Sequence, residues 1–164
     1  MLLEAPKPTE EQLREATEIE QAGQNRLKAK RESFERCDTD GFLTQWAHGV
    51  NADKDRMQAA ILRNGGYAEF PVLVDTATGE VVADKVYTFD NTFAGFGTVT
   101  KWKVDVAKYG RKWLPTGPKS RVQKTLGLEE QTRWFPAYAD LKSNGTGMSG
   151  QVWTEAVRKF ERKG

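Results

Sequence analysis

Residues 61–75 read ILRNGGYAEFPVLVD, and within them the spacing of the apolar side chains changes from helical to strand-like. Asn64, Gly65 and Gly66 form a strong helix C-terminal signal, because glycine tolerates the left-handed backbone conformation in which many helices end. Beyond the glycines, apolar residues alternate along residues 70–75, which is the period of a β-strand. The sequence therefore predicts helix before this junction and sheet after it.

Two helical segments are expected upstream of the junction. Thr9 and Gln12 have the spacing of a capping box, so the first helix should begin there. Its apolar stripe is thin and needs a partner, which is either the second helix or another copy of the chain in a coiled-coil seam. Residues 38–41 (DTDG) either kink or restart the helix. The sequence alone leaves open whether residues 9–37 and 40–64 form one rod or a hairpin.

Downstream of the junction, the sequence predicts an antiparallel meander followed by shorter elements. The meander strands are expected at residues 70–75, 80–89 and 96–104. The later elements are a short helix from Val106 to Trp113, a helical turn over residues 120–126, a strand over residues 134–142 and a last element over residues 151–163. Strand is preferred over helix for this last element, because Val152, Trp153 and Thr154 favour β structure.

The predicted fold class is α+β, with a long N-terminal helix or helical hairpin followed by a small antiparallel sheet or partly open barrel. A chain of 164 residues is near the commonest size for one domain. We therefore expect one structural domain overall. In it, residues 1–66 form a helical arm or hairpin that packs on a β-rich body of residues 67–164.

Charge is distributed unevenly along the chain. Residues 1–100 hold 11 Lys+Arg against 17 Asp+Glu, a net charge of −6, and residues 101–164 hold 14 against 6, a net charge of +8. Such a split indicates either two faces that neutralise each other within the fold or a basic surface that binds a polyanion. The arrangement of the cations in space distinguishes these two interpretations.

No segment has the pattern of an export signal or a membrane span. The N-terminal residues lack a basic stretch followed by an apolar run, and no uncharged stretch approaches the roughly 20 residues that cross a bilayer. The single cysteine, Cys37, cannot form an internal disulfide, which agrees with a reducing compartment. We expect a cytoplasmic protein with no membrane partner.

Two short segments carry a resemblance to known sequences. Residues 32–42 (ESFERCDTDGF), followed by residues 45–47 (QWA), resemble a segment of uncharacterised small proteins of actinobacteria and their phages and plasmids. Residues 145–150 (GTGMSG) are similar to a second segment of those proteins. The resemblance implies a mobile-element origin, and so the cytoplasm of a host cell if the protein is phage-encoded. It implies no catalytic residue.

The glycine-rich stretch at residues 145–150 also matches the pattern G-x-G-x-x-G. A dinucleotide-binding fold needs this turn inside a βαβ unit with an acidic residue about 20 positions later, and we expect no such unit here. A looser phosphate loop, in which converging backbone amides hold an anion, is retained as a candidate beside a plain hairpin loop. Its residues are Gly145, Thr146, Gly147, Ser149 and Gly150.

Asp38 and Asp40 are the weak candidates for a metal site. They are similar to the start of a calcium loop, but Leu43 and Gly49 stand where that loop requires glycine and glutamate. Helix capping by the same carboxylates is the simpler interpretation, although a site for a hard divalent ion that includes His48 is an alternative. We therefore expect no resident metal or other cofactor.

No catalytic constellation is evident in the sequence. Cys37 and His48 are the only residues of their types, and on one continuous helix they would lie roughly 16 Å apart, beyond the hydrogen-bond reach of a nucleophile and its base. The serines lack a nucleophile-elbow pattern. The interpretation leans towards a non-enzymatic protein.

The strongest functional signal is a basic region with aromatic residues between its charges. Nucleic-acid binders need cations that replace phosphate counterions, and single-strand binders add aromatic rings on which bases stack. The predicted phosphate contacts are Arg111, Lys112, Lys119, Arg121, Lys124 and Arg133. Trp102 lies on the apolar face of its strand and is expected in the core.

The leading hypothesis is a phage-type or mobile-element accessory protein that binds DNA or RNA through its basic C-terminal half and dimerises through its N-terminal helices. One alternative is a structural or host-interaction protein, such as a virion component or inhibitor, in which the acidic helix neutralises the cations. A second is a small enzyme or binder of a phosphorylated metabolite, marked by an apolar pocket beside the glycine-rich loop.

Overall fold

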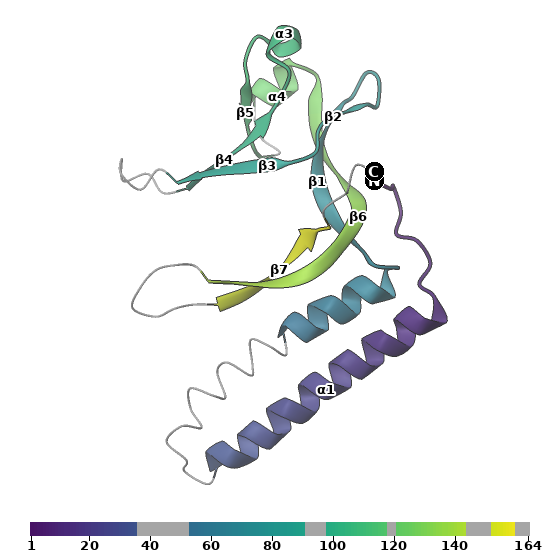
Figure 1. Ribbon diagram of the computed structural model, residues 1–164. Helices are drawn as coiled ribbons and strands as arrows, with labels where there is room; N and C mark the ends of the chain where they lie inside the picture. Colours follow the sequence, from purple (N-terminus) through teal and green to yellow (C-terminus); the bar gives the residue numbers. More distant parts are fainter. Residues whose placement is uncertain (36–52, 91–97, 118–120, 144–151, 160–164) are drawn as a thin grey trace. The chain divides into compact units, whose positions relative to one another are not determined.

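The computed structural model describes residues 1–35, 53–90, 98–117, 121–143 and 152–159 (Figure 1). The fold is α+β, as predicted, with a long N-terminal helix and antiparallel sheets. The chain divides into two compact units, one made of residues 1–68 with 134–164 and the other of residues 69–133. The first unit thus groups the C-terminal residues with the helices, whereas the sequence prediction placed them with the β-rich body.

The first helix, α1 (Glu10–Glu35), begins at the predicted capping box. The backbone N–H of Gln12 donates to the Thr9 hydroxyl at 3.1 Å, and the backbone N–H of Thr9 donates to Gln12 Oε1 at 3.0 Å. These reciprocal bonds satisfy two backbone donors that a helix N-terminus would otherwise leave without partners. The local sequence signal therefore predicts this helix start correctly.

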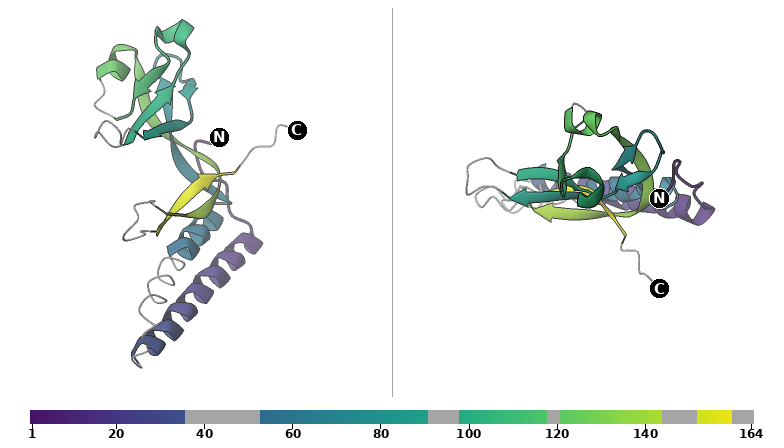
Figure 2. Two further views of the ribbon diagram at one scale, coloured as in Figure 1. Left: turned by 60° about the vertical axis from the view of Figure 1, so that its left-hand side comes forward. Right: turned by 90° about the horizontal axis from the view of Figure 1, so that it is seen from above.

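A second helix, described over residues 53–63, lies beside α1 and runs antiparallel to it (Figures 1 and 2). Ala16 of α1 is buried in a cluster with Ala59 and Leu62. Further along α1, Gly23 lies so close to the carboxylate of Asp55 that a Cβ atom there would be 3.0 Å from Asp55 Oδ2. The described parts of the two helices thus form a hairpin, and small residues let them approach closely.

The second helix ends at the predicted glycines. The backbone N–H of Gly66 donates to the Ile61 carbonyl at 2.9 Å, and that of Gly65 donates to Leu62 at 3.0 Å. Both glycines have positive φ angles, 71° and 85°. A Cβ atom at Gly65 would also lie 2.7 Å from Pro6 Cγ, so the N-terminal segment packs directly against this helix end. Glycine is therefore required at Gly65 by both conformation and space.

Seven strands are described, and their bounds are β1 (Tyr67–Asp75), β2 (Val81–Ala83), β3 (Val86–Asp90), β4 (Thr98–Lys103), β5 (Trp113–Pro115), β6 (Leu128–Ser143) and β7 (Val152–Arg158). They form a four-stranded sheet in the order β2-β1-β6-β7 and a three-stranded sheet in the order β3-β4-β5. The pairings of β1 with β2, of β3 with β4, of β4 with β5 and of β6 with β7 are antiparallel. The strand predicted within residues 151–163 is confirmed by β7.

Two of the elements predicted between residues 80 and 113 are wrong in detail. The run over residues 80–89 is not one strand, because it breaks at Asp84 and Lys85 into β2 and β3, which belong to different sheets. The helix predicted from Val106 to Trp113 is only α3 (Val106–Tyr109), since Gly110 adopts the left-handed conformation and caps it. Trp113 belongs instead to β5. The helical turn near residue 120 is present as α4 (Arg121–Thr125).

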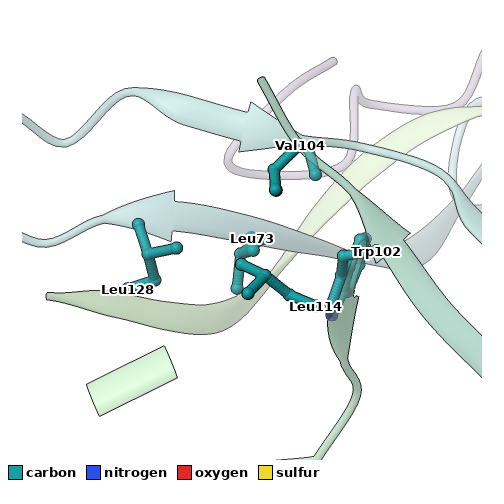
Figure 3. Close-up of a cluster of buried hydrophobic side chains, with 6 residues drawn as sticks. Leu73, Trp102, Val104, Leu114 and Leu128 are labelled. Atoms are coloured by element: carbon teal, nitrogen blue, oxygen red, sulfur yellow. The ribbon is translucent and has the colours of Figure 1, made fainter. Parts of the chain in front are cut away.

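Residues 69–133 enclose their own apolar core. The buried side chains come from both sheets and the adjoining segments, and they are Leu73, Ala83, Trp102, Val104, Leu114 and Leu128 (Figure 3). Trp102, Leu73 and Leu114 are essentially without solvent contact. Because strands of the two sheets share one core, this unit has the form of the predicted partly open barrel. The expectation that Trp102 is a core residue is confirmed.

The first unit joins the helical hairpin to the later part of β6. The backbone N–H of Ala137 donates to the Gly66 carbonyl at 3.0 Å, and that of Ala139 donates to Gln58 Oε1 at 2.9 Å. Leu2 pairs with Trp134 through two backbone hydrogen bonds. Across the described residues, none of the helices is long and apolar enough to cross a membrane.

Candidate nucleic-acid interface

One face of the β3-β4-β5 sheet carries aromatic and basic side chains. Cross-strand partners share a face of a sheet, and side chains alternate between faces along each strand. Tyr87 of β3 is paired with Lys101 of β4, and Lys103 of β4 is paired with Trp113 of β5. Trp102, between the two lysines, points to the core on the opposite face. The sheet therefore separates an apolar interior from an aromatic and basic exterior.

Three aromatic rings meet on this exterior face. The ring centroids of Tyr87 and Trp113 are 5.5 Å apart, and those of Phe89 and Trp113 are 5.0 Å apart. Both contacts are edge-to-face, with interplanar angles of 73° and 85°. Tyr87 and Phe89 nevertheless remain 41% and 42% exposed. Because these rings adjoin one another on one face of the sheet, they form a contiguous exposed aromatic patch, which is a candidate binding surface.

Lysines surround these rings. Lys101 and Lys103 share the face through their pairing, and Lys112 Nζ lies 5.5 Å from the centroid of the Trp113 ring. None of these three lysines forms an ion pair within the described part of the chain. We call this surface the aromatic-lysine face and define it as Tyr87, Phe89, Lys101, Lys103, Lys112 and Trp113.

Carboxylates are missing from the strand positions of this face. The described positions that point the same way also include Val99 opposite Phe89 and Pro115 opposite Lys101. Neither residue is acidic, so within the described strands no negative charge on the face offsets its lysines. The charges of neighbouring lysines then add to a positive potential that attracts anions.

Two ion pairs join α1 to the second helix of the hairpin, one with its carboxylate on α1 and the other with its carboxylate on the second helix. Glu20 accepts two hydrogen bonds of 2.7 Å from the guanidinium of Arg63, and Asp55 pairs with Arg26. The hydrogen bonds from Arg63 lower the pKa of Glu20, and Glu20 in turn raises the pKa of Arg63. These ion pairs pair opposite charges within the helical hairpin. The interpretation in which the acidic helix neutralises the cations of the later part of the chain stays a prediction from the sequence.

A partly buried network of hydrogen bonds centres on Glu130. Oε1 of Glu130 accepts hydrogen bonds from Trp102 Nε1 at 2.9 Å, from Gln123 Nε2 at 2.8 Å and from the backbone N–H of Gly117 at 2.8 Å. Gln123 is buried and also donates to the Pro115 carbonyl at 2.9 Å. Burial raises the pKa of Glu130, but these three hydrogen bonds outweigh it and leave the pKa below its usual value. The network joins β4, β5, α4 and β6.

The structure distributes the predicted phosphate contacts over separate elements. Arg111 and Lys112 are exposed just before β5, and Arg121 and Lys124 are exposed on α4. Of these four, Lys112 is joined to the aromatic-lysine face by its contact with Trp113. Arg133 is half-buried and its guanidinium donates to the Thr132 carbonyl and to Gln131 Oε1. Arg133 is thus held by its own strand.

Other predicted site residues fall outside the described residues. They are Lys119, the phosphate-loop residues Gly145, Thr146, Gly147, Ser149 and Gly150, and the weak metal candidates Asp38 and Asp40. Where the structure describes the chain, it contains no group of acidic, histidine and cysteine side chains that could hold a metal ion. These candidates stay predictions from the sequence.

The sequence prediction omits Tyr87 and Phe89, which supply the most exposed rings of the face. Alternation along β3 places both on one side, but only the register with β4 shows that this side also carries lysines. The local signal in the sequence is that Tyr87 and Phe89 are two residues apart, which places both rings on one side of a strand. The side of the sheet on which it lies depends on long-range pairing, which the sequence does not display.

A pocket of about 370 Å³ lies elsewhere in the same unit. Its lining residues are Thr76, Gln123, Lys124, Gly127, Leu128, Glu129 and Glu130. Two glutamates face a single lysine there, so the pocket does not favour a phosphorylated ligand. The glycine-rich loop, beside which the metabolite hypothesis expects an apolar pocket, lies outside the described residues.

The chain was compared with protein-family models, with curated proteins and with solved structures, and none of them matches it.

Proposed function

We propose that this protein binds nucleic acid through the aromatic-lysine face. The observation that carries the proposal is that one side of the β3-β4-β5 sheet combines exposed rings with lysines that form no ion pair among the described residues. Lysines supply the charge that replaces phosphate counterions, and rings supply surfaces for bases. Arg111, Arg121 and Lys124 are exposed in the same unit and extend the supply of cations.

The proposed binding surface differs from the one that the sequence predicts. The proposal places the centre of binding on one sheet face rather than along a series of basic residues, and it gives Arg133 a smaller part because two of its guanidinium N–H groups already donate within its own strand. The homodimer through the N-terminal helices stays a prediction, and part of the α1 seam is occupied by the second helix at Ala16. The mobile-element origin and the cytoplasmic location likewise stay predictions.

The test removes charge from the face without disturbing the core. In the double variant Lys101→Gln/Lys103→Gln, each lost phosphate contact reduces the slope of log affinity against log salt by about 0.7–0.9. If the two proteins have the same affinity when extrapolated to 1 M salt, the loss of two contacts weakens binding about 25- to 60-fold at 0.1 M salt. Fluorescence anisotropy of a labelled oligonucleotide, titrated at several salt concentrations, measures both quantities.

The matched control is Lys7→Gln/Lys28→Gln, which removes the same charge from exposed lysines of the other unit. Its affinity and salt slope should stay near those of the unchanged protein. The proposal is wrong if no oligonucleotide binds at low salt. It is also wrong if both double variants lose affinity equally, because binding would then follow net charge rather than this face.

A further inference from the structure

We infer that the ligand of the aromatic-lysine face is a single-stranded nucleic acid whose bases are unstacked from one another. This inference rests on the proposed function and specifies its substrate class. It is carried by the spacing and exposure of the rings, which are observations independent of the lysine charges that support nucleic-acid binding in general.

The spacing of the rings does not fit two neighbouring bases of a stacked strand. Tyr87 and Phe89 are two residues apart on β3, so their Cα atoms are about 7 Å apart along the strand. Successive bases in a duplex are only about 3.4 Å apart along the helix axis. Neighbouring bases can therefore contact both rings only after the strand has been stretched and the bases have separated.

Stacking on an aromatic ring requires a base whose flat face is exposed, and the bases of a duplex do not expose theirs. In a duplex each base is covered above and below by its neighbours, and only its edges are presented in the grooves. The edge-to-face contacts of Trp113 hold Tyr87 and Phe89 in defined positions while much of each ring stays in solvent. Such rings are suited to stacking on unpaired bases.

The lysines are placed to follow the backbone of such a strand. Lys101 lies opposite Tyr87, and Lys112 Nζ lies over the Trp113 ring, so each is next to a ring that would hold a base. A phosphate beside a stacked base then lies within reach of an ammonium group. The strand would cross the sheet with bases on the rings and phosphates at the lysines.

A second copy of the chain is the other occupant to consider for exposed rings. Two copies that met through this face would bring Lys101, Lys103 and Lys112 of one against the same lysines of the other. No carboxylate at the described strand positions would compensate the repulsion. Charge therefore favours a polyanion over self-association at this surface.

The experiment compares three labelled probes at one salt concentration: a single strand of mixed sequence, the same strand paired with its complement, and a strand of equal length that carries abasic residues. The abasic strand keeps the phosphates but offers no bases. The unchanged protein should bind the intact single strand at least about tenfold more tightly than either other probe, since each stacked base contributes on the order of tenfold in affinity.

The matching variant is Tyr87→Leu/Phe89→Leu, which keeps apolar side chains but removes the rings. It should bind the single strand at least about tenfold more weakly than the unchanged protein does. Its affinity for the intact strand should then be close to its affinity for the abasic strand. The control is Tyr138→Leu, because Tyr138 is 41% exposed on β6 and lies outside the face. It should bind like the unchanged protein. Circular dichroism and thermal unfolding check that each variant is folded.

The outcomes separate the two proposals. If all three probes bind alike and the Leu variant is unchanged while the Lys101→Gln/Lys103→Gln variant is weakened, the proposed function stands and the single-strand inference is overturned. If no probe binds, both are overturned. The inference also fails if the Leu variant converts a dimer to a monomer in sedimentation without altering affinity, because the rings would then serve self-association.

Discussion

Replacing Trp102 by alanine is expected to lower the free energy of unfolding of the unit formed by residues 69–133 by about 3–5 kcal/mol. The Trp102 side chain is 1% exposed and is the largest of the fully buried residues. It packs with Leu73 and Leu114 at the centre of the core (Figure 3). Its loss leaves a cavity that the surrounding strands can only partly fill, and it removes one of the donors to Glu130.

Urea unfolding measures this loss, and hydrogen exchange of the β4 and β5 amides shows whether it falls in the expected unit. Trp102→Phe separates two contributions, since it keeps an aromatic ring in the core but removes the indole N–H. Tyr138→Ala, at an exposed ring, should cost less than about 1 kcal/mol. A loss below that value for Trp102→Ala would mean that the described core does not hold this unit together.

Replacing Glu130 by alanine is the second change with a large expected effect. The variant removes the acceptor that Trp102 Nε1 and the backbone N–H of Gly117 use, and it removes one hydrogen bond of Gln123, which still donates to the Pro115 carbonyl. Because unpaired buried donors each cost about 1–3 kcal/mol, the free energy of unfolding should fall by about 2–5 kcal/mol near pH 7. Thermal or urea unfolding measures it.

The cost of Glu130→Ala should also depend on pH. The folded-state pKa of Glu130 lies below the usual value of 4.5, so the ionised carboxylate stabilises the fold above that value. This stabilisation is lost as the pH falls through the folded-state pKa. The difference between the unchanged protein and the variant should therefore shrink below about pH 4.5. Glu129→Ala, at the exposed neighbouring position, should show no comparable difference, and a pH-independent cost at Glu130 would contradict the assignment.

Local signals predict the helices and several strands because their causes lie within a few residues. The capping box at Thr9 and Gln12 and the glycines after residue 63 each form hydrogen bonds with near neighbours. The alternating apolar positions of β6 likewise appear as buried residues, among them Phe135, Ala137 and Ala139. These features depend on short-range geometry that a sequence displays directly.

The arrangement of the sheets could not be obtained in the same way. The run over residues 80–89 has continuous strand character, but it divides between two sheets at Asp84 and Lys85. Long-range pairing decides this division, and no local pattern marks it. The placement of Tyr87 opposite Lys101 follows from the same pairing, so the aromatic-lysine face exists only once the register of β3 and β4 is known.

The charge count predicted the candidate site only in part. The excess of cations in residues 101–164 includes Lys112, which contacts Trp113 on the face. The same count cannot show that Arg133 is hydrogen-bonded along its own strand or that the rings come from β3. Net charge reports how many cations a segment holds, whereas binding depends on which of them share a surface.

Photocrosslinking to a single-stranded oligonucleotide, followed by mass spectrometry of the crosslinked peptides, tests most directly whether the aromatic-lysine face is the binding surface. Aromatic rings stacked on bases are held in the contact that crosslinking requires. The account predicts crosslinks at Tyr87, Phe89 and Trp113, and their disappearance when the oligonucleotide is displaced by salt. Crosslinks confined to residues 1–68 or 134–164, obtained while the protein is saturated with the oligonucleotide, would contradict it.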